Sequence, residues 1–176
     1  MNQENQVTNE HDPELDAVRE AVARLTAGHT VLELGCGHGD ASKTIVHGAT
    51  CIVATDPADL PADVGGFDAV VLGFVWSRLK REAQEPYLRQ LRARLGKDVL
   101  VVILDDCYVE GSSLPVARTD SQGNTYQMET APGGGQVEMP KCYPTDSTLR
   151  KRLADAVREI KIQRWERYWV LSCRLK

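Results

Sequence analysis

The chain has 176 residues, of which 42% are hydrophobic and 26% are charged, and its formal net charge is −4. This length and composition favour one globular domain with a hydrophobic core. The acidic total argues against a nucleic-acid-binding surface, and no apolar run reaches the length of a membrane span. Residues 1–11 are polar and lack the apolar segment of a signal peptide. We therefore expect a cytoplasmic protein with a disordered tail at 1–11 and a single domain at 12–176.

Five cysteines are scattered along the chain, at positions 36, 51, 107, 142 and 173. They form no Cys-x-x-Cys pair, and no histidine lies at metal-ligand spacing from any of them. The pattern predicts free thiols in a reducing cytosol and no metal site.

The first elements are predicted from caps and periodicity. Asp12 followed by Pro13 is typical of a helix start, and apolar residues then repeat at helical spacing as far as Leu25. Thr30–Leu34 is predicted to be a central strand, and a second helix is expected from about Ala41 to His47.

A glycine-rich turn ends this first strand, with the sequence Glu33-Leu34-Gly35-Cys36-Gly37-His38-Gly39. Glycines let backbone approach a ligand without a Cβ in the way. Free N–H groups at the start of a following helix favour an anionic group. A buried strand that turns sharply into a helix therefore predicts a site for a nucleotide-like ligand.

A second apolar strand is predicted at Cys51–Asp56. Its last residue, Asp56, lies about twenty residues beyond the glycines, where an acid binds ribose hydroxyls in nucleotide-binding α/β folds. A solvated strand-end carboxylate is the alternative. Residues 57–66 are too few for a helix and another strand before the apolar segment 67–73, so the sheet is expected to be abridged here.

The remaining elements complete an α/β pattern. A helix is expected through Leu79 to Leu95, then a buried strand at Val99–Leu104. Residues 107–143 form a long polar excursion that contains a hairpin, and such excursions often shape a site. A helix from Pro144 through Val157 and two antiparallel strands, at 160–163 and 168–175, close the chain.

The segment Val31-Leu32-Glu33-Leu34-Gly35-Cys36-Gly37-His38-Gly39 resembles the first motif of class I S-adenosylmethionine (SAM)-dependent methyltransferases. The later order of strands and helices is similar to that fold as well. Asp40 stands where the dinucleotide-binding motif has its third glycine, which disfavours a hydride-transfer enzyme. The resemblance implies a Rossmann-like, doubly wound sheet, mostly parallel, with a C-terminal antiparallel hairpin. The sequence departs from the family after the second strand, where one strand/helix unit is expected to be missing.

The resemblance also implies which residues meet SAM and its product S-adenosylhomocysteine (SAH). Glycine backbone would lie against the methionine part, Glu33 would hold the amino group, and Asp56 would bind the ribose. The cofactor-binding residues that it implies are Glu33, Gly35, Cys36, Gly37, Gly39, Asp56, Pro57, Gly73 and Phe74. With the unit after the second strand reduced to 57–66, the adenine contact would come from a residue of this segment or from a second subunit in a homodimer.

Methyl transfer depends on positioning the two reactants, and an amine or hydroxyl acceptor can also need a base. Candidates at the expected mouth of the site are Asp105, Asp106 and Tyr108. Candidates for substrate binding are Trp76, Arg118, Tyr126 and Lys141, since a guanidinium or ammonium can bind an acceptor carboxylate or phosphate. The alternatives are a core position for Trp76 and internal salt bridges for the two cations.

No motif of a nucleic-acid, protein arginine or Mg²⁺-dependent catechol methyltransferase is found, so a small-molecule acceptor is expected by elimination. The resemblance is to a small-molecule branch of the kind found in bacterial secondary metabolism. The predicted function is methyl transfer to an N or O of a small metabolite, without nucleic acid or membrane partners. One alternative is a SAM- or SAH-binding module that does not methylate, and another is an RNA or protein methyltransferase.

Overall fold

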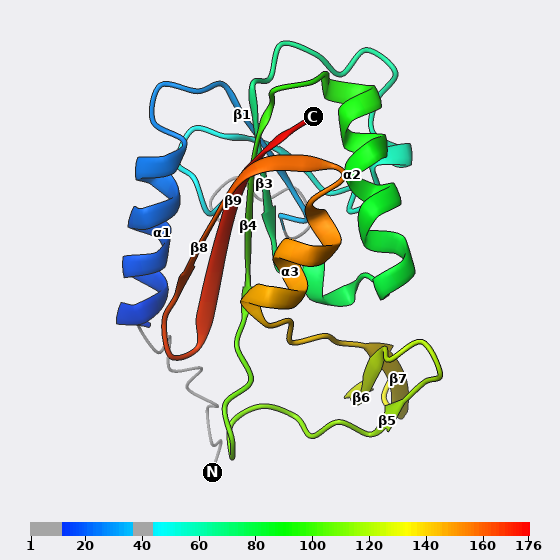
Figure 1. Ribbon diagram of the computed structural model, residues 1–176. Helices are drawn as coiled ribbons and strands as arrows, with labels where there is room; N and C mark the ends of the chain where they lie inside the picture. Colours follow the sequence, from blue (N-terminus) through cyan, green and yellow to red (C-terminus); the bar gives the residue numbers. More distant parts are fainter. Residues whose placement is uncertain (1–11, 37–43) are drawn as a thin grey trace.

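The computed structural model describes residues 12–36 and 44–176, which form one main sheet between helices and a small outlying sheet (Figure 1). The helices are α1 (Pro13–Leu25), α2 (Arg81–Leu95) and α3 (Asp146–Leu153), and two short 3-10 helices are η3 (Pro57–Asp59) and η4 (Trp76–Arg78). The main-sheet strands are β1 (Val31–Leu34), β2 (Thr50–Ile52), β3 (Ala69–Gly73), β4 (Leu100–Asp106), β8 (Val157–Arg164) and β9 (Tyr168–Leu175). The small sheet holds β5 (Arg118–Thr119), β6 (Thr125–Thr130) and β7 (Gln136–Pro140).

The main sheet has the strand order β2-β1-β3-β4-β9-β8. The strands β2, β1, β3 and β4 are parallel, while β9 is antiparallel to both β4 and β8. This confirms the predicted fold class, a mostly parallel sheet closed by an antiparallel C-terminal hairpin. It also confirms the abridgement, because only η3 stands between β2 and β3 in the chain apart from irregular segments.

The chain reverses direction across the sheet at β1. It runs from β1 to β2 on one side and then crosses back to β3 on the other side. In open α/β sheets, ligands bind outside the carboxyl ends of the strands at such a switch point. The topology alone therefore predicts a ligand site at the ends of β1 and β3.

Each face of the sheet is covered by helices, as Figure 1 shows. On one face, α1 packs Val18 and Val22 against Val31, Val71 and neighbouring sheet residues. On the other face, α2 and α3 contribute leucines that include Leu88 and Leu153 to a larger core cluster. Strands buried on both faces explain the near-continuous apolar runs of β3 and β4.

The start of α1 follows the sequence prediction. The Asp12 carboxylate accepts hydrogen bonds from the backbone N–H groups of Glu14 and Leu15, each at 3.1 Å, and Pro13 is the first helical residue. The hairpin expected within the excursion is also present, as β6 paired with β7. Among the described residues, none of the helices combines the length and hydrophobicity that a membrane crossing requires.

Three predicted boundaries are wrong. The strand expected at Cys51–Asp56 is shorter, ending at Ile52, and α3 ends at Leu153, so that Val157 already belongs to β8. The helix expected at 41–47 lies partly outside the described residues, and 44–47 is irregular and turn-like rather than helical. In that segment the N–H groups of Ile45 and Val46 bond to the Glu33 carboxylate, which competes with helical bonding.

The prediction of five free thiols is also wrong. Cys36 and Cys51 form a disulfide, with Cα atoms 6.1 Å apart, while Cys107, Cys142 and Cys173 are free. The pairing follows from the sheet, because Cys51 lies beside Glu33 in the parallel register of β1 and β2. Cys36 comes just after β1, within reach of the neighbouring strand.

Candidate functional site

Two glycines bring the ends of β1 and β3 into close contact at the switch point. Gly35 has a φ of +78°, and a Cβ placed on it would lie 2.6 Å from Val75 Cγ2. A Cβ on Gly73 would lie 2.3 Å from Ile45 Cδ1. The same built Cβ of Gly35 lies 3.7 Å from Thr55 Cγ2, which places the end of the β2 segment there too. Only glycine meets both the conformation and the space at position 35.

Glu33 holds the chain that follows the glycine-rich turn. Its side chain is buried, and both carboxylate oxygens accept from backbone: Ile45 N at 2.8 and 2.9 Å and Val46 N at 3.2 Å. Burial raises the pKa of this carboxyl, although the two N–H groups and the charge of Arg19 oppose the rise. The carboxylate thus fastens the 44–46 segment to β1. In the described structure both of its oxygens accept hydrogen bonds from the protein backbone.

Asp56 lies just beyond the β2 segment, and its side chain is exposed. Its Oδ1 atom accepts a hydrogen bond from Ala58 N at 2.8 Å, which begins η3, and Pro57 is buried behind it. The adjoining Thr55 carbonyl accepts from the Tyr87 hydroxyl at 2.7 Å, tying this segment to α2. Burial, and then the charge of Asp56, raises the pKa of Tyr87. Asp56 is therefore held in place, and among the residues that the structure describes only its Oδ1 atom accepts a hydrogen bond.

Phe74 follows β3 and has an unusual backbone conformation. Its backbone φ is +58°, a left-handed value that bulky side chains rarely adopt, while its N–H donates to the Leu104 carbonyl at 2.9 Å. The ring is 39% exposed and contacts Tyr168 edge-on, with centroids 6.2 Å apart. Strained, exposed aromatic residues at strand ends are characteristic of functional sites.

Trp76 occupies the core. Its side chain is fully buried and packs edge-on against Tyr87, with ring centroids 6.3 Å apart. The alternative stated for this residue, a core position, is what the structure shows. The buried ring presents no exposed surface to a substrate.

Asp105, Asp106 and Lys141 form a charged cluster where β4 ends. Asp105 is fully buried and accepts from the backbone N–H groups of Ser77, at 2.7 Å, and Asp106, at 2.8 Å. Lys141 Nζ lies 2.7 Å from Asp106 Oδ2 and 3.5 Å from Asp105 Oδ1. The internal salt bridge considered for Lys141 is thus what the structure shows.

Burial and the opposite charges act against each other on Asp105 and on Lys141. Burial raises the pKa of the Asp105 carboxyl, against the opposing charge of Lys141. For Lys141, burial alone would lower the pKa, but the two carboxylates raise it above its ordinary value. Lys141 is therefore a cation at neutral pH, and it orients Asp106, whose carboxylate is 39% exposed.

We call the hollow beside this cluster the Asp106 cavity. Its volume is about 310 Å³, in the range of small-molecule sites. It brings together residues from the ends of β4 and β7, the excursion and the β8–β9 turn: Arg78, Asp106, Cys107, Val109, Ser112, Ser113, Leu114, Gln127, Lys141, Tyr143, Arg167 and Tyr168. Tyr168 is missing from the sequence-based set, although its hydroxyl, which donates to Asp12 at 2.6 Å, and its contact with Phe74 place it at the site.

Other candidates lie elsewhere. Arg118 is on the small sheet, where its guanidinium pairs with Glu138 at 2.5 Å and stacks 4.1 Å from the Tyr126 ring centroid. Tyr126 is buried and donates to Asp120 at 3.0 Å. Both are therefore engaged within the small sheet. Tyr108 is exposed and packs edge-on against Tyr143.

Cys36, predicted to contact the cofactor, points its sulfur at Cys51 instead. Gly37 and Gly39 lie outside the described residues. Within the described ranges, no group of three His, Cys, Asp or Glu side chains could hold a metal ion.

Solved structures similar to this one include methyltransferases. The complex of DhpI with SAM and HEP has a TM-score of 0.63 at 17% identity, covering 92% of this chain and 87% of that one. The CcbJ methyltransferase from Streptomyces caelestis has a TM-score of 0.56 at 17% identity, covering 93% and 90%.

The glycopeptide N-methyltransferase MtfA, complexed with SAH, has a TM-score of 0.58 at 13% identity, covering 95% of this chain and 91% of that one. The chain has the fold of the class I methyltransferases. No protein-family model matches it, and no curated protein matches it in sequence. The methyltransferase fold places its strand ends, and hence Gly35, Asp56 and Phe74, along one edge of the sheet.

Proposed function

We propose that this protein is a SAM-dependent methyltransferase that transfers a methyl group to an N or O of a small metabolite. The observation that carries the proposal is the close approach of Gly35 and Gly73 at the topological switch point. The neighbours of the same fold include proteins crystallised with SAM or SAH. The Asp106 cavity, at the carboxyl end of β4, offers room for a small acceptor.

The residues of this edge fit SAM. The backbone of the turn at Gly35 suits the methionine part, the exposed carboxylate of Asp56 suits the ribose hydroxyls, and Gly73 and the Phe74 ring border the sulfonium. An aromatic face attracts a cation near it. When bound, SAM supplies a methyl group activated by its positive sulfur, and SAH is the product.

The chain's own residues position and orient the reactants. Glu33 fixes the segment that follows the glycine-rich turn, so that Ile45 stays against Gly73. Asp105 is a positioning residue, since it is buried and bonded to Ser77 and Lys141. We assign the role of base to Asp106, the one carboxylate of the pair that lines the cavity. Positioning alone can contribute roughly 7–11 kcal/mol to such a reaction.

A pair of glycine variants tests cofactor binding. Gly28 and Gly35 share the same φ of +78°, but a Cβ on Gly28 meets nothing within 4 Å. Both Gly→Ala changes add the same backbone strain, and only Gly35→Ala introduces a Cβ that meets Val75 and so disturbs the approach of β1 and β3 at the proposed site. Calorimetry with SAM should show binding for wild type and Gly28→Ala and a loss of at least about tenfold in affinity for Gly35→Ala.

Equal SAM affinity in the two variants would contradict the site, and no binding at millimolar SAM would contradict the function. One alternative rests on the short segment 57–66, which carries only η3. It is a SAM-binding module without methyl transfer. Turnover of SAM to SAH with a metabolite mixture supports the enzyme, whereas binding without any turnover favours the module.

A further inference from the structure

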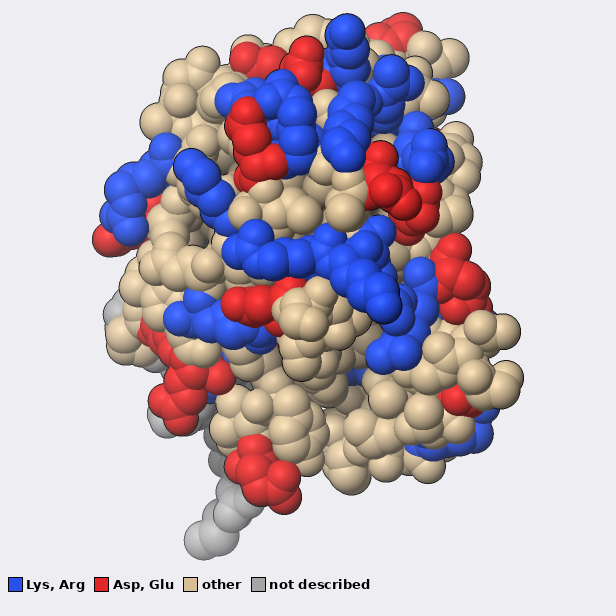
Figure 2. Space-filling model, in the orientation of Figure 1, with Lys and Arg blue, Asp and Glu red and all other residues tan. Residues whose placement is uncertain are grey.

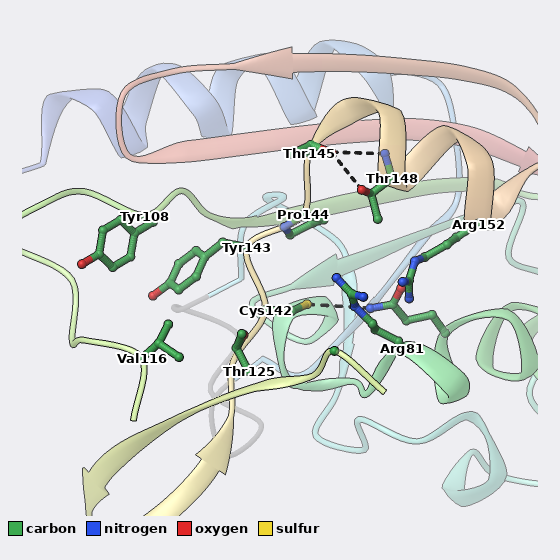
Figure 3. A pocket seen from close by; sticks show the side chains of 12 residues that line it. Arg81, Tyr108, Val116, Thr125, Cys142, Tyr143, Pro144, Thr145, Thr148 and Arg152 are labelled. Carbon is green, nitrogen blue, oxygen red and sulfur yellow. Dashed lines mark hydrogen bonds between the residues drawn. The ribbon is translucent and has the colours of Figure 1, made fainter. Parts of the chain in front are cut away.

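A second cavity shares Tyr143 with the Asp106 cavity, and we call it the arginine cavity. Its volume is about 330 Å³. It is formed by the start of α2, the excursion and the start of α3 (Figure 3), and it is lined by Arg81, Gln84, Tyr108, Val116, Gly123, Thr125, Cys142, Tyr143, Pro144, Thr145, Thr148 and Arg152. Of these described lining residues, two are cations and none is an acid.

The two arginines point toward one another without an anion between them (Figure 3). Within the described part of the chain, neither guanidinium is in an ion pair or donates a side-chain hydrogen bond. The other arginines near the sites are engaged: Arg78 with Glu129, Arg118 with Glu138, and Arg164 with Asp146. Arg81 and Arg152 therefore differ from these arginines, because no described acid forms an ion pair with either of them.

The electrostatics of the arginine cavity favour an anion. Burial, and then the charge of Arg81, lowers the pKa of Arg152, so the two cations repel each other across the space. Glu82 is nearby, but its carboxylate accepts from Asn124 Nδ2 at 3.0 Å. Glu85 and Asp155 line a neighbouring hollow that Arg81 and Arg152 also line, and Glu85 pairs with Arg89.

The position of Arg81 adds to the positive potential of the arginine cavity. It is the first residue of α2, where the aligned peptide dipoles already create a positive end, and cations are unfavourable there. Its backbone N–H donates to Asn124 Oδ1 at 2.8 Å, which holds the start of the helix at the cavity. Figure 2 shows Lys and Arg gathered over α3 despite the net charge of −4. A bound anion would offset this accumulation of positive charge.

We propose that the arginine cavity binds the phosphate group of a small molecule. Two guanidiniums match a doubly charged oxyanion better than a carboxylate, because each can donate two parallel hydrogen bonds. The ring of Tyr143, with Val116 and Pro144, supplies an apolar wall for the rest of the molecule. Resting on the proposed function, that molecule is the methyl acceptor, since Tyr143 also lines the Asp106 cavity.

Phenyl phosphate is the probe, with phenol and benzoate as controls for the ring and for a single charge. Calorimetry on the full chain should show phenyl phosphate binding more tightly than benzoate, and no binding of phenol. Arg81→Gln and Arg152→Gln should each weaken phenyl phosphate by at least about tenfold, the value of one lost charged hydrogen bond. Arg24→Gln removes an equal charge on exposed α1 and should bind as wild type does.

Phenyl phosphate that fails to bind wild type, or that binds the Arg81→Gln/Arg152→Gln double variant equally well, would overturn the proposal. Benzoate binding as tightly as phenyl phosphate would overturn the preference for a dianion. Titration of SAM into the same variants separates the two proposals, because neither arginine lies at the Gly35 edge. Retained SAM binding also shows that the variants are folded.

Discussion

Phe74 carries backbone strain directly after β3, and it is one of three described non-glycine residues with a positive φ, the others being Asp98 and Glu159. A non-glycine residue in the left-handed region costs about 1–2 kcal/mol, and this cost persists only where the surroundings impose it. Here the Phe74 N–H is tied to the Leu104 carbonyl and the ring is braced by Tyr168. The strained backbone presents an exposed ring at the proposed methyl-transfer centre.

Two substitutions separate the backbone from the ring. Phe74→Ala removes the ring and keeps the strain, whereas Phe74→Gly removes both. We expect Phe74→Gly to exceed Phe74→Ala in free energy of unfolding by about 1 kcal/mol, and both to bind SAM more weakly than wild type. Urea denaturation measures the first effect and calorimetry the second. A Phe74→Gly variant less stable than Phe74→Ala would show that the backbone is unstrained.

The Cys36–Cys51 disulfide makes a second residue-scale prediction. It closes a loop between positions 15 apart, which in the chain-entropy account contributes about 3 kcal/mol of stability. Cys51→Ser should lower the free energy of unfolding by about that amount, and dithiothreitol should lower the stability of wild type but not of the variant. Thiol titration of unreduced, denatured protein should find the three free cysteines. Five free thiols would contradict the pairing.

At the scale of elements, the sequence predicts buried strands well because their patterns are local. The apolar runs of β1, β3 and β4 and the cap of α1 carry their own signals. The 44–47 segment carries no such local signal, since its backbone N–H groups bond to the Glu33 carboxylate of β1. The partners of Lys141 and Cys36 likewise lie far along the chain, so neither the Asp105–Lys141 cluster nor the disulfide has a local pattern.

The turn between β5 and β6 depends on one carboxylate. Burial alone would raise the pKa of Asp120, but hydrogen bonds from Asn124, Tyr126 and Gln122 lower it to about 2. An acid whose folded pKa is lowered stabilises the fold above its unfolded pKa of about 3.9, and this stabilisation is lost as the pH falls toward the folded value.

Wild type should therefore lose more stability than Asp120→Asn when the pH falls from 5 to 3. Urea denaturation monitored at both pH values gives the comparison. The Asp63→Asn variant, in an exposed segment, is the control and should follow wild type. Equal losses in wild type and Asp120→Asn would show that this carboxylate does not support the turn.

At the scale of the whole molecule, the fold supplies a methyltransferase scaffold in which β2 is the edge strand of the sheet. Gly35 and Gly73 mark the switch point, the Asp106 cavity lies at the end of β4, and the arginine cavity lies beyond Tyr143. These three features lie on the carboxyl side of the parallel strands, where α/β folds bind their ligands. We therefore predict one continuous site with the cofactor at one end and an acceptor at the other.

A crystal structure of the protein with SAH tests this claim most directly. We predict that SAH binds across the ends of β1, β2 and β3, against the Gly35 backbone, with its ribose hydroxyls on Asp56 and its sulfur beside Phe74. SAH bound elsewhere on the protein, or a ribose that does not meet Asp56, would contradict it.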